Sequence, residues 1–282
     1  MLDLVLCTLN RQEQLVRYIS SLEHQRDQDW RLTVVDQNVD AGPVLRALGA
    51  LVDDSRVTIV RLIPGLARAR NVGLQRASAA GWVMFPDDDC YYPNDVALQG
   101  VCHCLLASSE RVGVVVFPLA TTGDDGRLTS ELPSLRIHGN LIRTKGLAAP
   151  GLAFRVEALR SVAGFDERFG IGARYPADED IDVIIRLLIG GWECVRVSYP
   201  TIIHPGNTDP DKLLRYAFAR GALCHKHQGS PIVKGWLWRE NVRHIREGWR
   251  RAELVTALRA MSRLISGYQA WTPELAPKRP FA

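Results

Sequence analysis

The sequence lacks the long apolar segments of an integral membrane protein. No run of about 18 apolar residues occurs in its 282 residues, so we expect no transmembrane helix. The first residues enter a strand-like stretch without a basic segment followed by an apolar one, so we expect no signal peptide. The shares of apolar (46%) and charged (23%) residues are ordinary and indicate a globular protein.

Paired cysteines are also missing. The six cysteines form no Cys-x-x-Cys pair, and Cys102 and Cys104 are too close for the usual spacing of a zinc site. Most of the cysteines lie among apolar residues, as buried free thiols do. This pattern favours a reducing compartment, so we expect a cytoplasmic protein.

A strong net charge is absent, and the weak one is unevenly distributed. The net charge of +4 is too small to argue for nucleic acid, which we do not expect as a partner. Eight Lys or Arg residues and only three acids lie in 234–263, and apolar residues recur at helical spacing through 234–268. Such a basic amphipathic helix either lies on an anionic membrane surface or packs on its own domain or a second subunit. The oligomeric state stays open.

The first 90 residues alternate between strand and helix patterns. Strands are predicted at 3–9, 32–36, 57–62 and 82–85, and helices at 11–25, 44–51 and 66–79. This alternation predicts an α/β fold with a mixed, mainly parallel sheet flanked by helices. Ligands bind at the carboxyl ends of strands in such sheets, and acids stand at two of these ends.

The rest of the chain is predicted to extend this domain and then to become helical. Further strands are predicted at 112–119, 152–155 and 193–197, and further helices at 156–162 and 179–188. Residues 120–150 are rich in Gly, Thr, Ser and Pro and are expected to form a long loop or lid. We therefore expect one domain over 1–208 and a C-terminal helical tail over 209–282.

Three adjacent aspartates, Asp87–Asp89, follow the fourth predicted strand. Adjacent carboxylates repel one another unless a cation or solvent satisfies them. Residues i and i+2 of an extended segment point the same way, so Asp87 and Asp89 are expected to face one site. Oxygen ligands suit Mg²⁺ or Mn²⁺. A solvated acidic turn is the alternative, but the place at a strand's carboxyl end favours a metal site.

A second acidic run, Asp178–Asp182, opens the helix predicted at 179–188. Asp178 is a candidate cap, and early carboxylates suit the helix dipole. Four acids in five residues exceed what one cap needs, so one of them is a candidate general base.

Two smaller features are candidates on chemistry alone. Gly65 precedes a helix that carries Arg70 and Asn71, and an arginine offers a planar charged fork for phosphate or a base edge. The alternative is an ordinary surface arginine. His204 ends a strand-like stretch and is either a metal ligand or a structural histidine.

These features, in this order, resemble the family 2 glycosyltransferases of the GT-A fold. The resemblance spans residues 3–225 and rests on six segments: 6–11 (LCTLNR), 34–36 (VVD), 65–73 (GLARARNVG), 85–89 (FPDDD), 164–169 (GFDERF) and 179–182 (EDID). Each segment is weak or moderate alone, whereas the ordered set is specific. The resemblance implies a Rossmann-like GT-A domain with a nucleotide-sugar donor half over 1–95 and an acceptor half over 96–208.

The resemblance also implies roles for the matching positions. Residues expected at the donor nucleotide are Thr8, Asn10, Arg11, Asp36, Arg70, Asn71, Asp87 and Asp88. Residues expected at a divalent metal, Mn²⁺ or Mg²⁺, are Asp87, Asp89 and His204. Asp180, with Glu179 beside it, is the expected base of an inverting transfer. Residues expected on the acceptor side are Gly164, Phe165, Asp166 and Asp178.

The implied substrates are a nucleotide-sugar, a UDP-sugar by preference, and a sugar or lipid-linked acceptor. The implied setting is cell-surface polysaccharide or glycolipid synthesis, in the cytoplasm or at the inner face of the cell membrane. The chain departs from the family pattern at 36–39, which read Asp-Gln-Asn-Val instead of Asp-Asp-Gly-Ser. The third aspartate leaves open which two of Asp87–Asp89 bind metal. The Gln-x-x-Arg-Trp motif of processive synthases is absent, which favours one sugar per event.

Two alternative functions share this architecture. A sugar-1-phosphate nucleotidyltransferase would need a Gly-rich phosphate loop after the first strand, and the segment from Thr8 to Arg11 contains no glycine. A non-catalytic scaffold on the same fold is disfavoured by the full set of acids.

Overall fold

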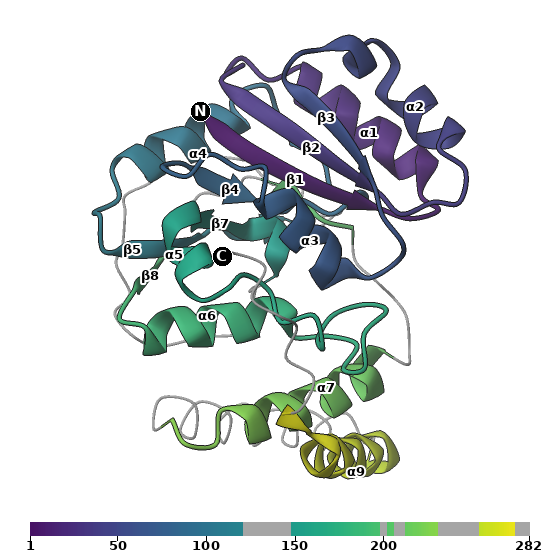
Figure 1. Ribbon diagram of the computed structural model, residues 1–282, viewed down its shortest axis with the longest axis vertical. Coiled ribbons are helices and arrows are strands. Elements are labelled where there is room, and N and C mark those ends of the chain that lie inside the picture. The colour runs from purple at the N-terminus through teal and green to yellow at the C-terminus, as the bar shows by residue number, and fades with distance from the viewer. Residues whose placement is uncertain (121–147, 198–201, 206–211, 231–253, 274–282) are drawn as a thin grey trace.

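Seven strands form the central sheet of the computed structural model, which describes residues 1–120, 148–197, 202–205, 212–230 and 254–273 (Figure 1). The strand order is β3-β2-β1-β4-β7-β5-β8. The bounds are β1 Leu2–Thr8, β2 Trp30–Asp36, β3 Val57–Arg61, β4 Trp82–Met84, β5 Val112–Val116, β7 Leu152–Arg155 and β8 Glu193–Arg196. All neighbours are parallel except β7, which runs antiparallel to β4 and β5. The predicted mixed, mainly parallel sheet is confirmed.

Helices cover both faces of this sheet. Their bounds are α1 Gln12–Glu23, α2 Gly42–Leu48, α3 Leu66–Leu74, α4 Ala97–Leu106, α5 Val156–Ser161 and α6 Glu179–Ile189, with 3-10 turns at Gly49–Asp53 and Ala149–Gly151. Side chains of β1 alternate between two cores: Leu4 and Leu6 pack with α1, α2 and α4, whereas Val5 packs with α3, α5 and α6. Burial on both faces is why the strands read as continuous apolar runs.

The packing of α3 on β1 depends on Gly73. A Cβ atom there would lie 2.1 Å from Cγ1 of Val5, so no side chain fits between helix and strand. The prediction that this helix runs to residue 79 is wrong. The N–H of Ser78, which a longer helix would donate to Leu74, donates instead to Asp3 Oδ2 at 2.8 Å. The end of α3 is thereby fixed by a side chain from β1.

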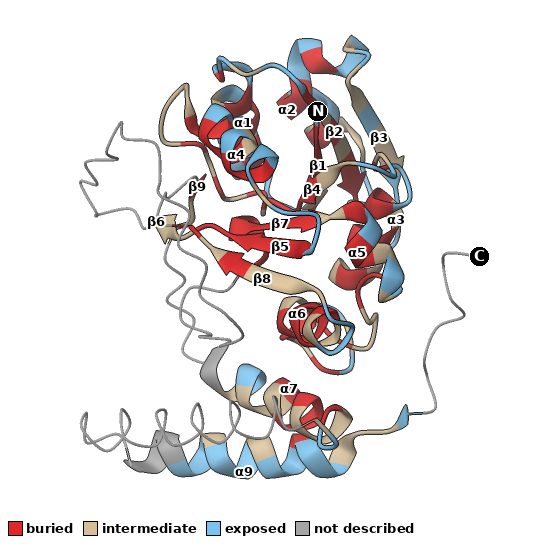
Figure 2. Cartoon of the chain, turned by 90° about the vertical axis from the view of Figure 1, so that its left-hand side faces the viewer, coloured by how far each residue is buried: buried red, intermediate tan, exposed pale blue. Residues whose placement is uncertain are grey.

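Two C-terminal helices, α7 (Lys212–Lys226) and α9 (Leu254–Ala270), pack against each other beyond α6 (Figures 1 and 2). A Cβ atom at Gly221 would lie 1.9 Å from the carbonyl oxygen of Leu264, and one at Gly267 would lie 1.9 Å from that of Phe218. The two backbones are therefore in direct contact. The predicted helical character of the C-terminal region is confirmed for these helices.

The end of α9 is joined to the loop that precedes α6. The ring of Trp271 lies 5.8 Å from that of Phe169 and 5.6 Å from that of Tyr175, measured between centroids. Most of the basic segment 234–263 and of the predicted loop 120–150 lies outside the described residues. Among the helices that are described, none is long and apolar enough to cross a membrane.

Candidate active site

The carboxyl ends of β1, β2 and β4 bring predicted donor residues to one edge of the sheet. Thr8 ends β1 and Asp36 ends β2, and both are almost completely buried. Asp87 follows β4 and pairs with Cys7 through an isolated bridge. This edge is where α/β sheets bind their ligands.

The middle aspartate of the acidic run points back toward β1. Asp88 Oδ2 accepts a hydrogen bond from the hydroxyl of Thr8 at 2.9 Å, and its Oδ1 lies 3.4 Å from the guanidinium of Arg11. Burial raises the pKa of Asp88 to about 6, against the opposing effects of Thr8 and Arg11. Arg11 also forms an ion pair with Asp89 at 2.6 Å. Asp88 is therefore held by Thr8 of β1 and shares Arg11 with Asp89.

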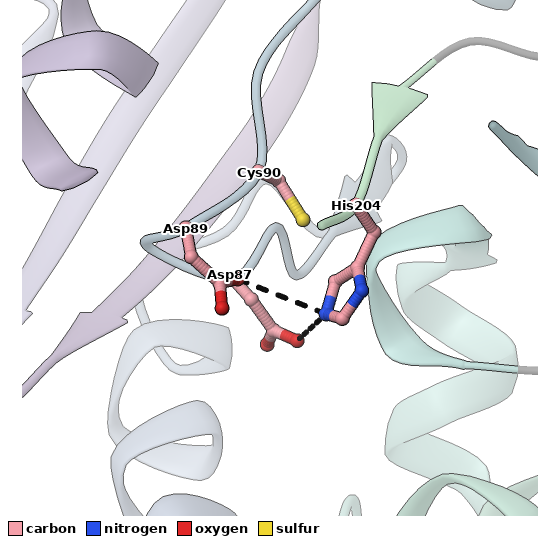
Figure 3. Close-up of side chains that lie close together, drawn as sticks. All are labelled: Asp87, Asp89, Cys90 and His204. Carbon is pink, nitrogen blue, oxygen red and sulfur yellow. Dashed lines mark ion pairs between the residues drawn. The ribbon is translucent and has the colours of Figure 1, made fainter. Parts of the chain in front are cut away.

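Asp87, Asp89 and His204 lie together with Cys90 (Figure 3). One ligand atom from each of the four lies within 4.8 Å of the others. His204 Nε2 is 3.5 Å from Asp87 Oδ2 and 3.7 Å from Asp89 Oδ1. Asp89 Oδ1 is buried and accepts no hydrogen bond from the described residues. The four side chains thus offer oxygen, nitrogen and sulfur atoms as possible metal ligands. One of these atoms, Asp89 Oδ1, has room for a further bond.

Backbone pairing brings His204 to this cluster from more than 100 residues away. Ile203 of β9 (Ile202–Ile203) exchanges two hydrogen bonds with Tyr91, and β9 pairs with β6 (Leu119–Ala120). Burial opposes ionisation of Asp87, but its hydrogen bond with His204 and the charge of Arg70 outweigh that effect and lower its pKa. The cluster therefore contains an ionised carboxylate at neutral pH.

Arg70 joins the two acidic runs. It is 3% exposed, and its guanidinium lies 2.7 Å from Glu179 Oε1 and 3.3 Å from Asp87 Oδ1. A buried arginine between two carboxylates is fixed in orientation. The strand-end cluster and the start of α6 therefore form one continuous site.

Asp36 has one satisfied and one unsatisfied oxygen. Its Oδ1 accepts from the backbone and side-chain amides of Asn38 at 2.9 and 2.7 Å. Its buried Oδ2 accepts no hydrogen bond from the described residues, and Nε of Arg61 lies 3.8 Å from it. The side chain of Asn38 also accepts from the backbone N–H of Asn10 at 2.6 Å. The loops after β1 and β2 are thereby held together beside a buried acceptor.

Asp180 lies in the first turn of α6 and is only partly buried. Its Oδ2 accepts from the backbone N–H of Ala149 at 3.1 Å, and its Oδ1 from that of Ile181 at 2.8 Å. Burial, followed by the negative charge of Glu179, raises the pKa of Asp180 to about 7. A carboxyl group with a pKa near neutrality can accept a proton from a hydroxyl group.

The predicted acceptor-side loop is held by Asn71. The side chain of Asn71 donates to the carbonyl oxygen of Phe165 at 2.9 Å and accepts from its N–H at 2.8 Å. Asp166 pairs with Arg168 and Lys226, each at 2.6 Å. Gly164 has a φ of 68°, a conformation that favours glycine. These side chains fix the loop, while the roles predicted for them at substrates stay predictions.

Comparison with known proteins identifies the family. Residues 3–146, half of the chain, match the description "Glycosyl transferase family 2". The chain belongs to glycosyltransferase family 2. No match is found among curated protein sequences. The family assignment favours the glycosyltransferase over the nucleotidyltransferase and the scaffold.

Solved structures support the fold of this family 2 glycosyltransferase. Residues 1–349 of TarS from S. aureus, in complex with UDP-GlcNAc, are 16% identical, with a TM-score of 0.67 over 94% of this chain and 81% of that chain. The mannosyltransferase PcManGT from Pyrobaculum calidifontis, in complex with GDP-Man and Mn²⁺, is 17% identical, with a TM-score of 0.61 over 96% of this chain and 76% of that chain. These similarities confirm the predicted GT-A fold.

Three residues in or near the candidate site of this glycosyltransferase are not predicted from the sequence: Cys90, Arg220 and Lys226. Cys90 directly follows Asp89, and this adjacency to a predicted metal ligand is the signal that the sequence offers for it. Two residues of α7 form ion pairs with the acidic run at the start of α6: Arg220 lies 2.6 Å from Asp178, and Lys226 lies 2.6 Å from Asp182. Nothing in their local sequence pointed to these partners, because they lie about 40 residues away along the chain.

Proposed function

We propose that this enzyme is an inverting, metal-dependent glycosyltransferase that moves a single sugar from a nucleotide-sugar to an acceptor hydroxyl. The observation that carries the proposal is the continuity of the site. The Asp87–Asp89–His204 cluster and Asp180 are linked through Arg70 and Glu179 at the carboxyl edge of the sheet. A leaving-group site and a base lie on the two sides of this link.

The donor set fits a divalent cation, Mn²⁺ or Mg²⁺. Asp87 and Asp89 offer carboxylate oxygens and His204 offers Nε2, all within 4.8 Å of one another. The buried Oδ1 of Asp89 accepts no hydrogen bond from the described residues, as expected for an oxygen reserved for a cation. A cation held by these residues would neutralise charge on the departing diphosphate. Mn²⁺ in PcManGT supports this choice.

The donor nucleotide is proposed to lie along the loops after β1 and β2. Asp36 Oδ2 is a buried acceptor suited to an N–H of the base, because an unpaired buried acceptor is costly without a ligand. The neighbouring loop contains Thr8, Asn10 and Arg11. Thr8 and Arg11 hold the carboxylate of Asp88 beside it. UDP is favoured as the nucleotide by analogy with TarS, and GDP is the alternative that PcManGT supplies.

Asp180 is proposed as the general base. Its carboxylate takes the proton of the acceptor hydroxyl while the hydroxyl oxygen forms a bond to the anomeric carbon. The bond from that carbon to the diphosphate oxygen breaks on the opposite face, so the configuration inverts and the nucleoside diphosphate leaves. Burial, followed by the negative charge of Glu179, keeps the pKa of Asp180 high enough for this task, and Arg70 holds Glu179 at 2.7 Å.

The setting is proposed to be polysaccharide or glycolipid synthesis at the cytoplasmic face of the membrane. The outer side of α9 carries exposed apolar side chains at helical spacing, Leu258, Met261 and Ile265. These side chains support a surface contact of the tail with lipid or with a lipid-linked acceptor.

A thermal-shift comparison tests the donor site. UDP and GDP are added with Mn²⁺ or with a chelator to the wild type, Asp89→Asn and, as a matched control, Asp95→Asn, whose carboxylate forms an exposed pair with Arg26. We expect one nucleotide at 100 times its dissociation constant to stabilise the wild type by about 2.7 kcal/mol, and only with metal. The control should respond equally and Asp89→Asn should not. Absence of a metal-dependent shift in the wild type would contradict the proposal.

A further inference from the structure

The residue before α6 has an unusual backbone conformation. Asp178 has a φ of 67°, in the left-handed region, and is the N-cap of α6. Aspartate adopts this conformation more readily than most non-glycine residues, but at a cost that surrounding contacts must offset. The two residues that follow, Glu179 and Asp180, belong to the proposed catalytic site. The conformation of Asp178 therefore fixes the direction in which the first turn of α6 starts.

A side chain from α7 holds Asp178 in place. Arg220 Nε donates to Asp178 Oδ2 at 2.6 Å, and its NH2 group donates to Oδ1 at 2.7 Å. The side chains of Asp178 and Arg220 are 5% and 16% exposed. Two parallel, charge-assisted bonds in a buried place restrict both the position and the rotation of a carboxylate.

The rest of α6 is attached to α7 independently of this pair. Asp182 is completely buried and pairs with Lys226 at 2.6 Å, with His227 at 2.8 Å and with Arg186 of α6 itself at 2.7 Å. These bonds hold α6 at Asp182, at the end of its first turn. The pair between Arg220 and Asp178 adds a second attachment one residue before the helix, at the cap.

We infer that Arg220 is a positioning residue for the catalytic carboxylate: by holding Asp178 in the left-handed conformation, it directs Asp180 toward the acceptor. The inference deepens the proposed function and rests on it, because it takes Asp180 as the base. It also makes α7 part of the catalytic apparatus of this enzyme.

Several charged groups face Asp180 and bear on its reactivity. Glu179 and Asp178 come from the start of α6, Arg70 comes from α3, and Arg220 comes from α7. Tyr216 of α7 lies one turn before Arg220, and the charge of Asp180 reaches its phenol group. Loss of the Arg220 cation would leave Asp180 facing two carboxylates and Tyr216, with Arg70 as the remaining cation among these groups.

Kinetics of three arginine variants test the positioning role. We expect Arg220→Gln to lower kcat about tenfold or more, because a misplacement of about 1 Å can cost about 100-fold, while the donor KM changes less than about twofold. Arg220→Lys should recover part of the loss, since lysine keeps the charge without the two-pronged contact. Arg26→Gln, which removes an exposed arginine–aspartate pair, is the matched control and should keep the wild-type kcat.

A double variant separates positioning from a general loss of stability. Glycine adopts a positive φ without strain, so Asp178→Gly combined with Arg220→Gln should recover kcat relative to Arg220→Gln alone. Amide hydrogen exchange gives a readout that needs no activity, because the N–H of Asp182 donates to the carbonyl oxygen of Asp178 at 2.9 Å. Its exchange should accelerate in Arg220→Gln and return toward wild type in the double variant.

The outcomes distinguish the two proposals. An unchanged kcat in Arg220→Gln, or an equal loss in the single and double variants, would overturn the positioning role. A wild type that shows no metal-dependent nucleotide binding would instead overturn the proposed function, whatever the exchange data show. Faster exchange together with a lower kcat and an unchanged donor KM would support the inference.

Discussion

Two acidic runs of similar composition are treated differently by the fold. The run after β4 keeps Asp87 and Asp89 near one histidine and leaves a buried oxygen of Asp89 without a hydrogen-bond donor among the described residues. The run at α6 gives Asp178 and Asp182 close cationic partners, Arg220 in one case and Lys226 with His227 in the other. The first run also has cationic partners, Arg11 at 2.6 Å from Asp89 and Arg70 at 3.3 Å from Asp87, so the two runs differ chiefly in the oxygen of Asp89 that is left to accept a bond.

The difference is one of partners rather than of residue type, and we propose that it separates carboxylates that act on substrates from those that hold the fold. Within the second run, the pKa of Asp180 is raised to about 7, chiefly by burial, whereas that of Asp182 is lowered well below its usual range because its cations outweigh burial. Two carboxylates that are two residues apart therefore differ in protonation near neutral pH. Substitutions in the two runs test this distinction.

The largest effect is expected for Asp180→Asn. Removal of a general base should lower kcat by about 100- to 10,000-fold, while the stabilisation by nucleotide and metal stays as in the wild type. Single-turnover transfer with the identified donor measures the rate, and thermal shift measures donor binding. A loss of donor binding equal to the loss of rate would assign Asp180 to the donor side instead.

A large effect on stability, without a role in the chemistry, is expected for Asp182→Asn. Breaking a buried ion pair costs about 3–5 kcal/mol, because Lys226, His227 and Arg186 lose their common acceptor. Urea denaturation measures this loss. The control is Glu193→Gln, whose exposed pair with Arg111 should contribute less than about 1 kcal/mol. Equal losses in the two variants would refute the distinction between structural and surface pairs.

A smaller loss of stability is expected for Asn71→Ala. The substitution removes both hydrogen bonds to Phe165 and leaves the buried N–H and carbonyl group of Phe165 unpaired. The free energy of unfolding should fall by about 1–3 kcal/mol. Denaturation measures the cost, and titration with nucleotide measures whether Asn71 also contacts the donor. Weakened nucleotide binding with unchanged stability would favour the donor role predicted from the sequence.

The smallest effect is expected from pH. Because Asp180 acts in its ionised form and its pKa is about 7, kcat should rise about tenfold per pH unit below that value and level off above it. Asp88, with a pKa of about 6, also titrates in this range. The Asp88→Asn variant should therefore keep the break near pH 7. A profile without a break between pH 5 and 8 would contradict the assignment of the base.

The sequence was informative where chemistry follows the local pattern. Alternating strands and helices predicted the sheet and the strand ends that carry Asp36 and Asp87, and the same alternation failed only at local details such as the end of α3. The partners of Asp178 and Asp182 could not be predicted, since an ion pair between α6 and α7 depends on how two distant helices pack. The proximity of His204 to Asp87 is predicted by the ordered resemblance to a family and not by the residues next to His204 in the sequence.

The direct contact between α7 and α9 has a consequence for how such sequences can diverge. Gly221, which touches the backbone of Leu264, immediately follows Arg220. Any larger residue at 221 would force the helices apart and carry the guanidinium of Arg220 away from Asp178. Among homologues that keep this pair, we therefore expect position 221 to remain glycine, even though it belongs to the crossing of α7 and α9 and to neither acidic run. Natural variation at a remote helix crossing would then be limited by the demands of catalysis.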